Sequence, residues 1–329
     1  MEKGEKPMNI NKYIGHPSQL YGVEEHRLVG GKGDGQRIYE ITNGKGIEMT
    51  VSPDRNGDIT RLRFKGINMS YMNPCGYVAP AYYDDTGTNW LRSFTAGYLT
   101  TCGLNNVGNP NVDGDEVLPL HGSIGNTPCE NAYHFERDGE LVVKTTTRDE
   151  VIFGRKFLFE RELAVSLEEN SFTITDTITN TNDVRQPFEI LYHMNMGYPL
   201  LDEDSVITIP SSEVIPRNEH AAEDVANWMH MQKPTEQYEE RCYYHKFADG
   251  KGFAKIEQPK LGVSLAISFD ARELDGFVEW KMMGVRDYVL GLECGNCYCE
   301  GRSETGKSGM LKYLNPGESK TYQVKITLE

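Results

Sequence analysis

The chain lacks any long run of apolar residues. A helix that spans a bilayer needs about 18 consecutive apolar positions, and the 329 residues contain no such stretch. The first residues, MEKGEKPMNINKY, carry charge but no apolar segment typical of a signal peptide. We therefore expect a cytoplasmic protein that does not have a membrane as a partner.

Cysteine is sparse, with 7 in total, an odd number spread over a long chain. This usage favours reduced thiols over a disulfide framework. Three of the cysteines lie in the run CGNCYC, and Cys242 with His245 could add two further ligands for zinc. No second CxxC cluster is present, so we expect no metal and regard these thiols as core or surface residues.

Positive charge is in the minority. The 34 basic residues face 49 acidic ones, which gives a formal net charge of −15. Such a surface repels phosphate backbones, so nucleic acid is not expected as a partner, whereas a neutral sugar is not disfavoured. A hydrophobic content of 38% in a chain of this length is enough for a large globular core.

Helical periodicity is rare, but alternation of apolar and polar residues is common. Residues 156–167 alternate in this way, and after the turn at 168–170 the alternation resumes over 172–179. Period-two patterning on both sides of a turn predicts a β-hairpin. Residues 322–328 have the same pattern. Further candidate strands are 36–42, 46–52, 59–65, 140–148, 186–196, 205–210, 253–257, 263–269 and 287–293.

Turn dipeptides such as Asn43-Gly44 and Asp138-Gly139 separate these segments. Only 219–231 has a convincing helical pattern. Many short strands with few helices predict an all-β fold, a sandwich or a barrel. With no internal repeat or linker, the sequence favours one large antiparallel β-sandwich domain over 31–329, preceded by an irregular N-terminal arm over 1–30.

Polar side chains interrupt the apolar segment PFEILYHMNMGYPL. In an extended strand, one face is apolar from Phe188 to Met194, and the other face carries His193 and Asn195. These two residues either form a solvent-facing row or place an imidazole on a concave sheet face. An imidazole suits acid–base catalysis because its ordinary pKa is about 6.5.

Two other segments combine a polar side chain with a neighbouring glycine. In DYVLGLECGN, Gly291 and Glu293 share a strand face, so the glycine leaves space beside the carboxylate. In LPLHGSIGN, Pro119 restrains the chain and Gly122 allows a tight turn, so His121 is held at a loop or strand end. A solvated Glu293 and a His121 bonded to the backbone are the alternative interpretations.

Together these segments resemble the galactose mutarotase (aldose 1-epimerase) superfamily. LPLHGSIGN, ILYHMNMGYPLL and VLGLECGN carry their histidines and glutamate in the order of that family, and NWLRSFTAGYLTTCGLNNVG is similar to a block before its His-Gly motif. The similarity covers the chain from about residue 30 onward and is greatest to a poorly characterised aldose 1-epimerase-like branch, a domain of unknown function. It implies a supersandwich, a large antiparallel β-sandwich with its site on a concave sheet face.

The resemblance implies an isomerase that interconverts the α and β anomers of a free or modified sugar. In that role Glu293 is the general base on the anomeric hydroxyl, and His193 is the general acid on the ring oxygen. His121 binds and polarises the sugar, and Arg92 is a loose match to the family's site arginine. Proton transfer is the whole chemistry, so no cofactor is implied.

Four more residues are candidates for binding the sugar: Asn195, Tyr198, Trp280 and Lys281. An indole face stacks on sugar C–H groups, and an ammonium group donates to hydroxyls. The alternative places Trp280 in the core and Lys281 in solvent. The sequence beyond His193 departs from the aromatic pattern of classical galactose mutarotases, so it does not specify galactose.

Two other functions are compatible with the sequence. One is a non-catalytic carbohydrate-binding protein on the same fold, and the other is a polysaccharide-active lyase or hydrolase. A catalytic base together with a catalytic acid argues against the first, because binding alone needs neither. The sequence also leaves open whether the sugar is charged and whether the chain forms a homo-oligomer.

Overall fold

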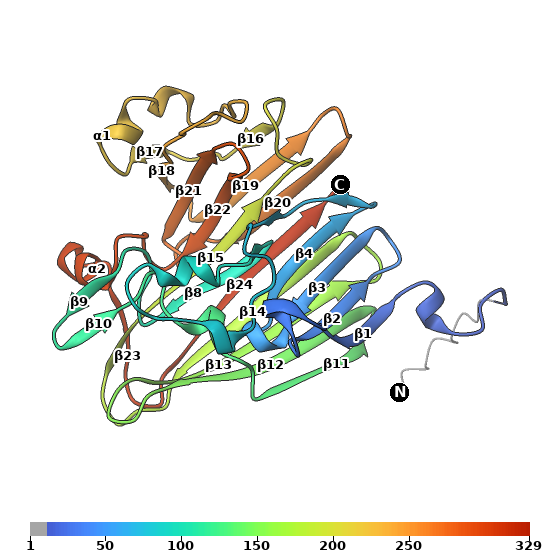
Figure 1. Ribbon diagram of the computed structural model, residues 1–329, viewed down its shortest axis with the longest axis horizontal. Helices are drawn as coiled ribbons and strands as arrows, with labels where there is room; N and C mark the ends of the chain where they lie inside the picture. The colour runs from blue at the N-terminus through green and yellow to red at the C-terminus, as the bar shows by residue number, and fades with distance from the viewer. Residues whose placement is uncertain (1–11) are drawn as a thin grey trace.

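Antiparallel sheets dominate the computed structural model, which describes residues 12–329 (Figure 1). The largest sheet has eight strands, in the order β11 (Asn131–Arg137), β12 (Glu140–Glu150), β13 (Lys156–Ser166), β14 (Ser171–Asn180), β24 (Ser319–Leu328), β20 (Val263–Asp270), β19 (Lys251–Gln258) and β16 (Val206–Thr208). A seven-stranded sheet has the order β17 (Glu213–Pro216), β18 (Arg241–Lys246), β21 (Gly276–Met283), β22 (Tyr288–Gly295), β15 (Gln186–Met196) and β23 (Lys312–Leu314), with β8 (Leu99–Leu104) also paired to β15.

The N-terminal part of the chain forms a third, five-stranded sheet. Its strands follow chain order: β1 (Gly22–Arg27), β2 (Arg37–Thr42), β3 (Ile47–Ser52), β4 (Asp58–Phe64) and β5 (Ile67–Asn68). Two small ribbons pair β6 (Tyr71–Met72) with β7 (Ala96–Gly97) and β9 (Asn111–Asp113) with β10 (Glu116–Leu118). The short 3-10 turns are η1 (Pro17–Gln19), η2 (Gly31–Gly33), η3 (Pro53–Arg55), η4 (Pro80–Tyr82), η5 (Asn89–Arg92), η6 (Ile124–Asn126) and η7 (Val225–Asn227).

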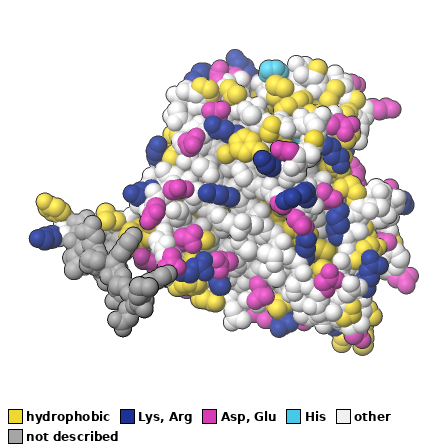
Figure 2. Space-filling model, turned by 180° about the vertical axis from the view of Figure 1, so that it is seen from behind, with side chains coloured by type: hydrophobic (Ala, Val, Ile, Leu, Met, Phe, Trp, Pro, Cys, Tyr) yellow, Lys and Arg dark blue, Asp and Glu magenta, His cyan; other side chains and the backbone are white. Residues whose placement is uncertain are grey.

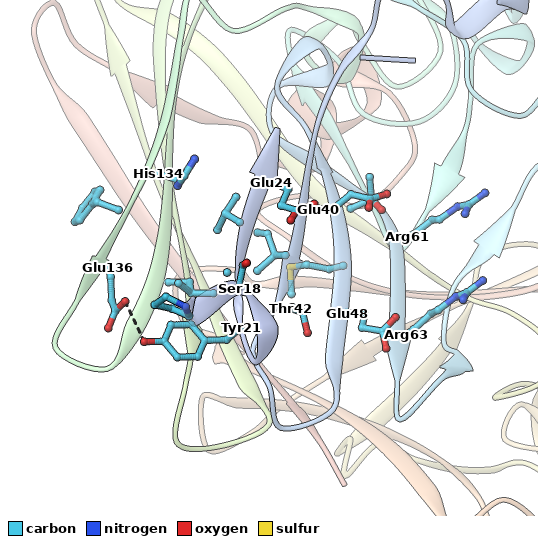
Figure 3. A pocket seen from close by; sticks show the side chains of 18 of the residues that line it. Ser18, Tyr21, Glu24, Glu40, Thr42, Glu48, Arg61, Arg63, His134 and Glu136 are labelled. Carbon is cyan, nitrogen blue, oxygen red and sulfur yellow. Dashed lines mark hydrogen bonds between the residues drawn. The ribbon is translucent and has the colours of Figure 1, made fainter. Parts of the chain in front are cut away.

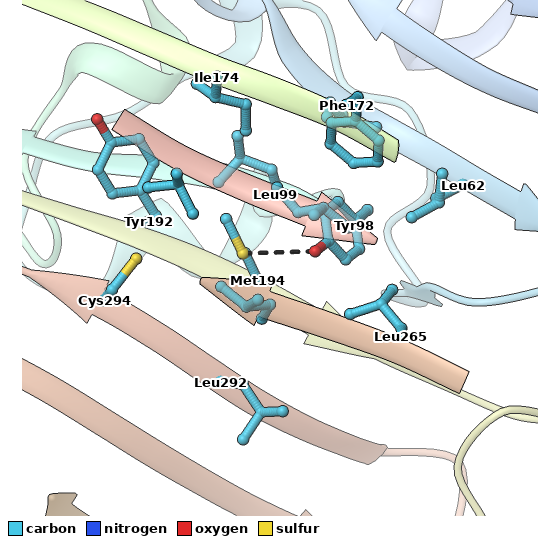
Figure 4. Packing of buried hydrophobic residues seen from close by; sticks show 14 of the residues in the cluster. Leu62, Tyr98, Leu99, Phe172, Ile174, Tyr192, Met194, Leu265, Leu292 and Cys294 are labelled. Atoms are coloured by element: carbon cyan, nitrogen blue, oxygen red, sulfur yellow. Dashed lines mark hydrogen bonds between the residues drawn. The ribbon is translucent and has the colours of Figure 1, made fainter. Parts of the chain in front are cut away.

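Apolar side chains from the three large sheets meet in one large buried cluster, and a second, smaller cluster includes Leu191 of β15. Figure 4 shows Phe172 and Ile174 of β14 packed near Tyr192 and Met194 of β15, and all four belong to one buried cluster. A fully buried side chain of this kind contributes about 1.5–3 kcal/mol. The period-two pattern of β15 directs these residues into the core and leaves its other face for polar side chains.

The strands expected from the sequence are confirmed. Each candidate segment contains a strand, and in the predicted hairpin β13 and β14 pair with Leu163 opposite Ile174. The predicted all-β antiparallel architecture is therefore correct. Part of the predicted N-terminal arm, residues 1–11, lies outside the described residues. Within the rest of that arm, β1 is a regular strand paired with β2 rather than an irregular segment.

The helices differ from the expectation. The predicted helix at 219–231 is reduced to α1 (Glu219–Ala222) and the turn η7. Farther along this segment, the carbonyl oxygens of Asn227 and His230 accept hydrogen bonds from Lys281 Nζ, which turns them away from a helical ladder. A second helix, α2 (Arg302–Ser308), was not predicted because its sequence RSETGKS has no apolar period.

Among the described residues, no helix combines the length and the apolar character needed to cross a bilayer. On the face seen in Figure 2, apolar side chains are scattered among charged side chains of both signs.

Candidate active site

Two neighbouring strands, β15 and β22, bring His193 and Glu293 together. They pair antiparallel with Asn195 opposite Gly291 and Leu191 opposite Gly295, which places His193 across from Glu293. The distance from His193 Nδ1 to Glu293 Oε1 is 3.3 Å. Only 5% of His193 and 2% of Glu293 is exposed, so this pair is almost fully removed from solvent.

Gly291 makes the space that the Glu293 carboxylate occupies. A Cβ atom at this position would lie 2.2 Å from Glu293 Oε1 and 3.0 Å from Trp280 Cβ. Any larger residue would therefore displace the carboxylate. The prediction that this glycine clears room beside Glu293 is confirmed.

His121 approaches the pair from a loop that is hydrogen-bonded to β8. Its backbone has a φ of 56°, in the left-handed region that non-glycine residues rarely adopt. The His121 carbonyl accepts a hydrogen bond from the Gly103 amide, and its own amide donates to the Gly108 carbonyl. The imidazole Nδ1 accepts from the Gly108 amide at 3.2 Å, and the ring centroid lies 5.5 Å from that of His193. The neutral ring therefore carries its proton on Nε2.

Aromatic rings surround the three polar side chains. Trp90 lies 4.9 Å from His121, and Phe94 and Trp280 each lie 5.3 Å from His193, measured between ring centroids. Trp280 Nε1 donates to Glu240 at 2.7 Å, which orients the indole. Trp90 and Phe94 were missed in the sequence, where the block that contains them suggested only Arg92.

Burial shifts the proton equilibria of the pair toward uncharged forms. Desolvation lowers the pKa of His193 to about 4, although the nearby Asn195 side chain opposes the shift. Desolvation also raises the pKa of Glu293 well above its ordinary value, with a further contribution from Cys299, while the positive charge of Arg217 opposes it. At neutral pH these directions favour a protonated carboxyl beside a neutral imidazole.

The pair also retains free hydrogen-bonding capacity. His193 Nδ1 and Glu293 Oε1 are close, but their geometry is not that of a hydrogen bond, and neither atom has a partner among the described residues. Asn195 Nδ2 donates to the His193 carbonyl at 2.9 Å, while its Oδ1 is likewise without a partner in the described part of the chain. Buried polar atoms without partners are costly, so such a cluster is suited to receive hydrogen bonds from a ligand.

The structure does not bring Lys281, Tyr198 and Arg92 to this cluster. Lys281 is next to Trp280 on β21, and adjacent strand residues point to opposite faces. Its buried ammonium group donates to the Asn227 carbonyl instead. Tyr198 lies beyond the end of β15 with 71% of its surface exposed, and Arg92 is exposed at the end of η5. We therefore remove Lys281 from the set of sugar-binding candidates.

No metal centre is formed within residues 12–329: no group of three or more His, Cys, Asp or Glu side chains is arranged to hold an ion. The 7 cysteines are free thiols. The buried side chain of His245 lies with its Nε2 3.2 Å from Glu279 Oε2, so it is not directed at the CGNCYC thiols.

A large cavity of about 690 Å³ lies away from His121 and His193, between the five-stranded sheet and β11 (Figure 3). It is lined by carboxylates such as Glu24, Glu40 and Glu136, and Tyr21 donates to Glu136 at 3.4 Å. None of the residues in the His193–Glu293 cluster lines it. This cavity is therefore separate from the candidate active site.

Comparison with solved structures places this fold among known β-sandwiches. A "putative aldose 1-epimerase" from Klebsiella pneumoniae aligns with a TM-score of 0.87 and 26% identity, covering 94% of this chain and 85% of that one. A galactose mutarotase-like protein from Clostridium acetobutylicum aligns with a TM-score of 0.66 and 15% identity, covering 94% and 99%. The Slr1438 protein from Synechocystis aligns with a TM-score of 0.66 and 16% identity, covering 92% of this chain and 99% of that one.

These alignments and the sheet topology define a galactose mutarotase-like β-sandwich protein. A search of curated proteins found no matching sequence. Residues 33–328 match the model of a family described as a domain of unknown function, DUF4432, and the chain belongs to this family. The resemblance expected from the sequence is thereby confirmed.

Proposed function

We propose that the chain is an aldose 1-epimerase-like isomerase that interconverts the α and β anomers of a sugar. The observation that carries this proposal is the 3.3 Å approach of His193 Nδ1 to Glu293 Oε1 on a buried face that also holds His121. Ring opening needs one group that takes a proton and one that gives a proton, and a carboxyl beside an imidazole supplies both. The Klebsiella pneumoniae neighbour bears a name of the same kind, which supports the proposal.

In this reaction the Glu293 carboxylate removes the proton of the anomeric hydroxyl, and the His193 imidazolium donates its proton to the ring oxygen. The bond between the anomeric carbon and the ring oxygen breaks, which leaves an open-chain aldehyde. Rotation about the next carbon–carbon bond presents the other carbonyl face, and the reverse transfers close the ring. Each proton returns to its donor, so the pair is regenerated without any co-reactant.

Burial favours the uncharged form of the pair, whereas this cycle starts from the charged form. The two forms differ only by the transfer of one proton between neighbouring atoms. Sugar hydroxyls replace part of the hydration that the charges lose on burial, and Arg217 also stabilises the Glu293 carboxylate. Substrate binding therefore shifts the pair toward its reactive form.

Surrounding residues orient the sugar. His121 carries its proton on Nε2, because Nδ1 accepts from the Gly108 amide, so it donates a hydrogen bond to a sugar oxygen. The indole of Trp280 offers an apolar face to sugar C–H groups, and the free Oδ1 of Asn195 accepts from a hydroxyl. Orientation of this kind adds to the effect of the acid and the base.

The test follows the equilibration of pure anomers of several free aldoses by polarimetry or NMR. We expect the protein to accelerate equilibration and the substitution Glu293→Gln to reduce the rate by about 10²–10⁴-fold, since it removes the base but keeps the shape. Glu304→Gln is the matched control, because Glu304 is an exposed residue of α2 paired with Lys307.

Two results would contradict the proposal: no acceleration with any aldose, or an unchanged rate in Glu293→Gln. Tight binding of a sugar without faster equilibration would instead support the carbohydrate-binding alternative. Release of reducing ends from a polysaccharide would support the lyase or hydrolase alternative.

A further inference from the structure

A second groove, of about 470 Å³, lies where β15 ends and β22 begins. Its lining includes Arg61, Arg63 and Arg286, and no Asp or Glu of the described chain lines it. This is unusual in a chain whose formal net charge is −15. The groove is therefore a local concentration of positive charge on an acidic protein.

These arginines make no ion pair within residues 12–329, although Arg61 and Arg63 also border the neighbouring cavity of Figure 3, whose lining includes carboxylates. None of the three forms an ion pair with a carboxylate in the described part of the chain, and Arg61 only lies over the ring of Tyr77, at 5.7 Å. Arg63 has Glu48 as its cross-strand neighbour, but the two side chains make no ion pair within residues 12–329. Arg61 and Arg63 project from the same face of β4 with their guanidinium groups pointing the same way (Figure 3). Their hydrogen-bond donors are therefore available to a ligand.

Hydrogen bonds hold the floor and rim of the groove. Tyr71 donates to Asp287 Oδ1 at 3.3 Å, next to Arg286 in the turn before β22. Asn68 Nδ2 donates to the carbonyls of Ser70 at 2.6 Å and Tyr198 at 2.7 Å. Arg286 itself has a φ of 72°, in the left-handed region that non-glycine residues rarely adopt. The turn thus holds an arginine where glycine would be less strained.

We propose that this groove binds the phosphate group of a small phosphorylated metabolite. Guanidinium groups bind phosphate through paired N–H···O bonds, and three arginines line this groove with no carboxylate of the described residues among the lining. The exposed ring of Tyr198 provides a surface for the carbon skeleton. The volume lies in the range of pockets for small ligands, whereas the net charge disfavours a nucleic acid.

This ligand is distinct from the sugar in the candidate active site. Tyr198 lies in the turn beyond the end of β15, and none of His121, His193 and Glu293 lines the groove. The proposal therefore stands independently of the proposed function.

The test is isothermal titration calorimetry of the full chain at low ionic strength, with inorganic phosphate, glucose 6-phosphate and adenosine monophosphate as probes and chloride as a control anion. We expect one phosphate site per chain and weakening by roughly tenfold to a hundredfold in Arg63→Ala and in Arg286→Ala, because each removes charge-assisted hydrogen bonds. Arg63→Lys keeps the charge but loses the paired geometry, so we expect an intermediate loss.

Arg272→Ala is the matched control. It removes one exposed arginine, paired with Asp270 and not part of the groove lining, so phosphate affinity should stay at the wild-type value. Glucose 6-phosphate binding more tightly than phosphate supports a sugar phosphate as the ligand, and tighter binding of adenosine monophosphate supports a nucleotide. The proposal is overturned if no probe binds, if chloride competes as well as phosphate, or if the two groove variants bind like Arg272→Ala.

Discussion

At the scale of single residues, burial determines the chemistry of the proton pair. Glu293 and His193 are both ordinary titratable groups in water, but each loses its hydration where β15 and β22 meet. The pKa of the carboxyl rises and the pKa of the imidazole falls, because burial penalises the charged form of each. Such perturbed groups are typical of functional sites, and they also link the stability of the protein to pH.

The two residues should affect stability in opposite ways as pH changes. Glu293 keeps its proton when folded, so its contribution is present below its ordinary pKa of 4.5 and is lost as pH rises above that value. His193 stays neutral when folded, so its contribution is present above pH 6.5 and falls by about 3 kcal/mol as pH drops toward 4.

Thermal unfolding measured from pH 4 to pH 8 checks the direction in which each contribution changes. The melting temperature of Glu293→Gln, relative to that of the wild type, should increase as pH rises. The melting temperature of His193→Asn, relative to that of the wild type, should increase as pH falls. Parallel curves for both variants would show that the pair does not titrate as its burial predicts.

The position of His121 depends on the residue that follows it. Gly122 has a φ of 70°, and a Cβ there would lie 2.2 Å from the carbonyl oxygen of Gly103. We expect Gly122→Ala to destabilise the fold by more than about 1 kcal/mol and to reduce anomer equilibration, because the loop must move away from β8. Urea unfolding and polarimetry measure the two effects, and a variant equal to the wild type in both would refute this role of the glycine.

At the scale of elements, Arg161 of β13 joins the sheets. It donates to Asp176 of β14 at 2.7 Å, to Asp58 of β4 at 2.8 Å and to Thr101 of β8 at 2.8 Å. Thr101 in turn donates to Asp58 at 2.6 Å. Strands from all three large sheets therefore meet at one buried guanidinium group.

Loss of this group should be severe. Arg161→Met leaves two buried carboxylates without their cation, and removing one partner of a buried pair typically costs about 3–5 kcal/mol. Arg137→Met is the control on the same sheet, since its pair with Glu162 is exposed, and we expect a loss of at most about 1 kcal/mol. Urea denaturation followed by circular dichroism measures both, and equal losses would contradict the central role of Arg161.

At the scale of the whole molecule, the larger of two buried apolar clusters connects the sheets. A single cluster of buried apolar residues includes Phe64 of β4, Phe159 of β13 and Ile190 of β15. Because each sheet buries its apolar face against this cluster, no sheet can separate without exposing the others.

This continuity predicts one cooperative unfolding transition. Tryptophan fluorescence reports on the seven-stranded sheet through Trp280, while far-ultraviolet circular dichroism reports on all strands, and the two curves should coincide. Two separate transitions would show that the sheets unfold independently.

The sequence by itself determined the strands and the direction in which their side chains point. Alternation of apolar and polar residues is local, so it assigned β13, β14, β15 and β22, and it placed His193 and Glu293 away from the core. The same alternation separates Trp280 from Lys281, although both were expected to bind the sugar.

Only the tertiary structure decided which distant residues meet. The register of β15 against β22 sets the 3.3 Å approach of His193 to Glu293, and register depends on the packing of entire sheets rather than on either strand alone. Trp90 and Phe94 reach the histidines from an irregular segment that has no periodic signal. Local patterns dictate local geometry, whereas contacts between remote segments arise from the cooperative burial of the whole core.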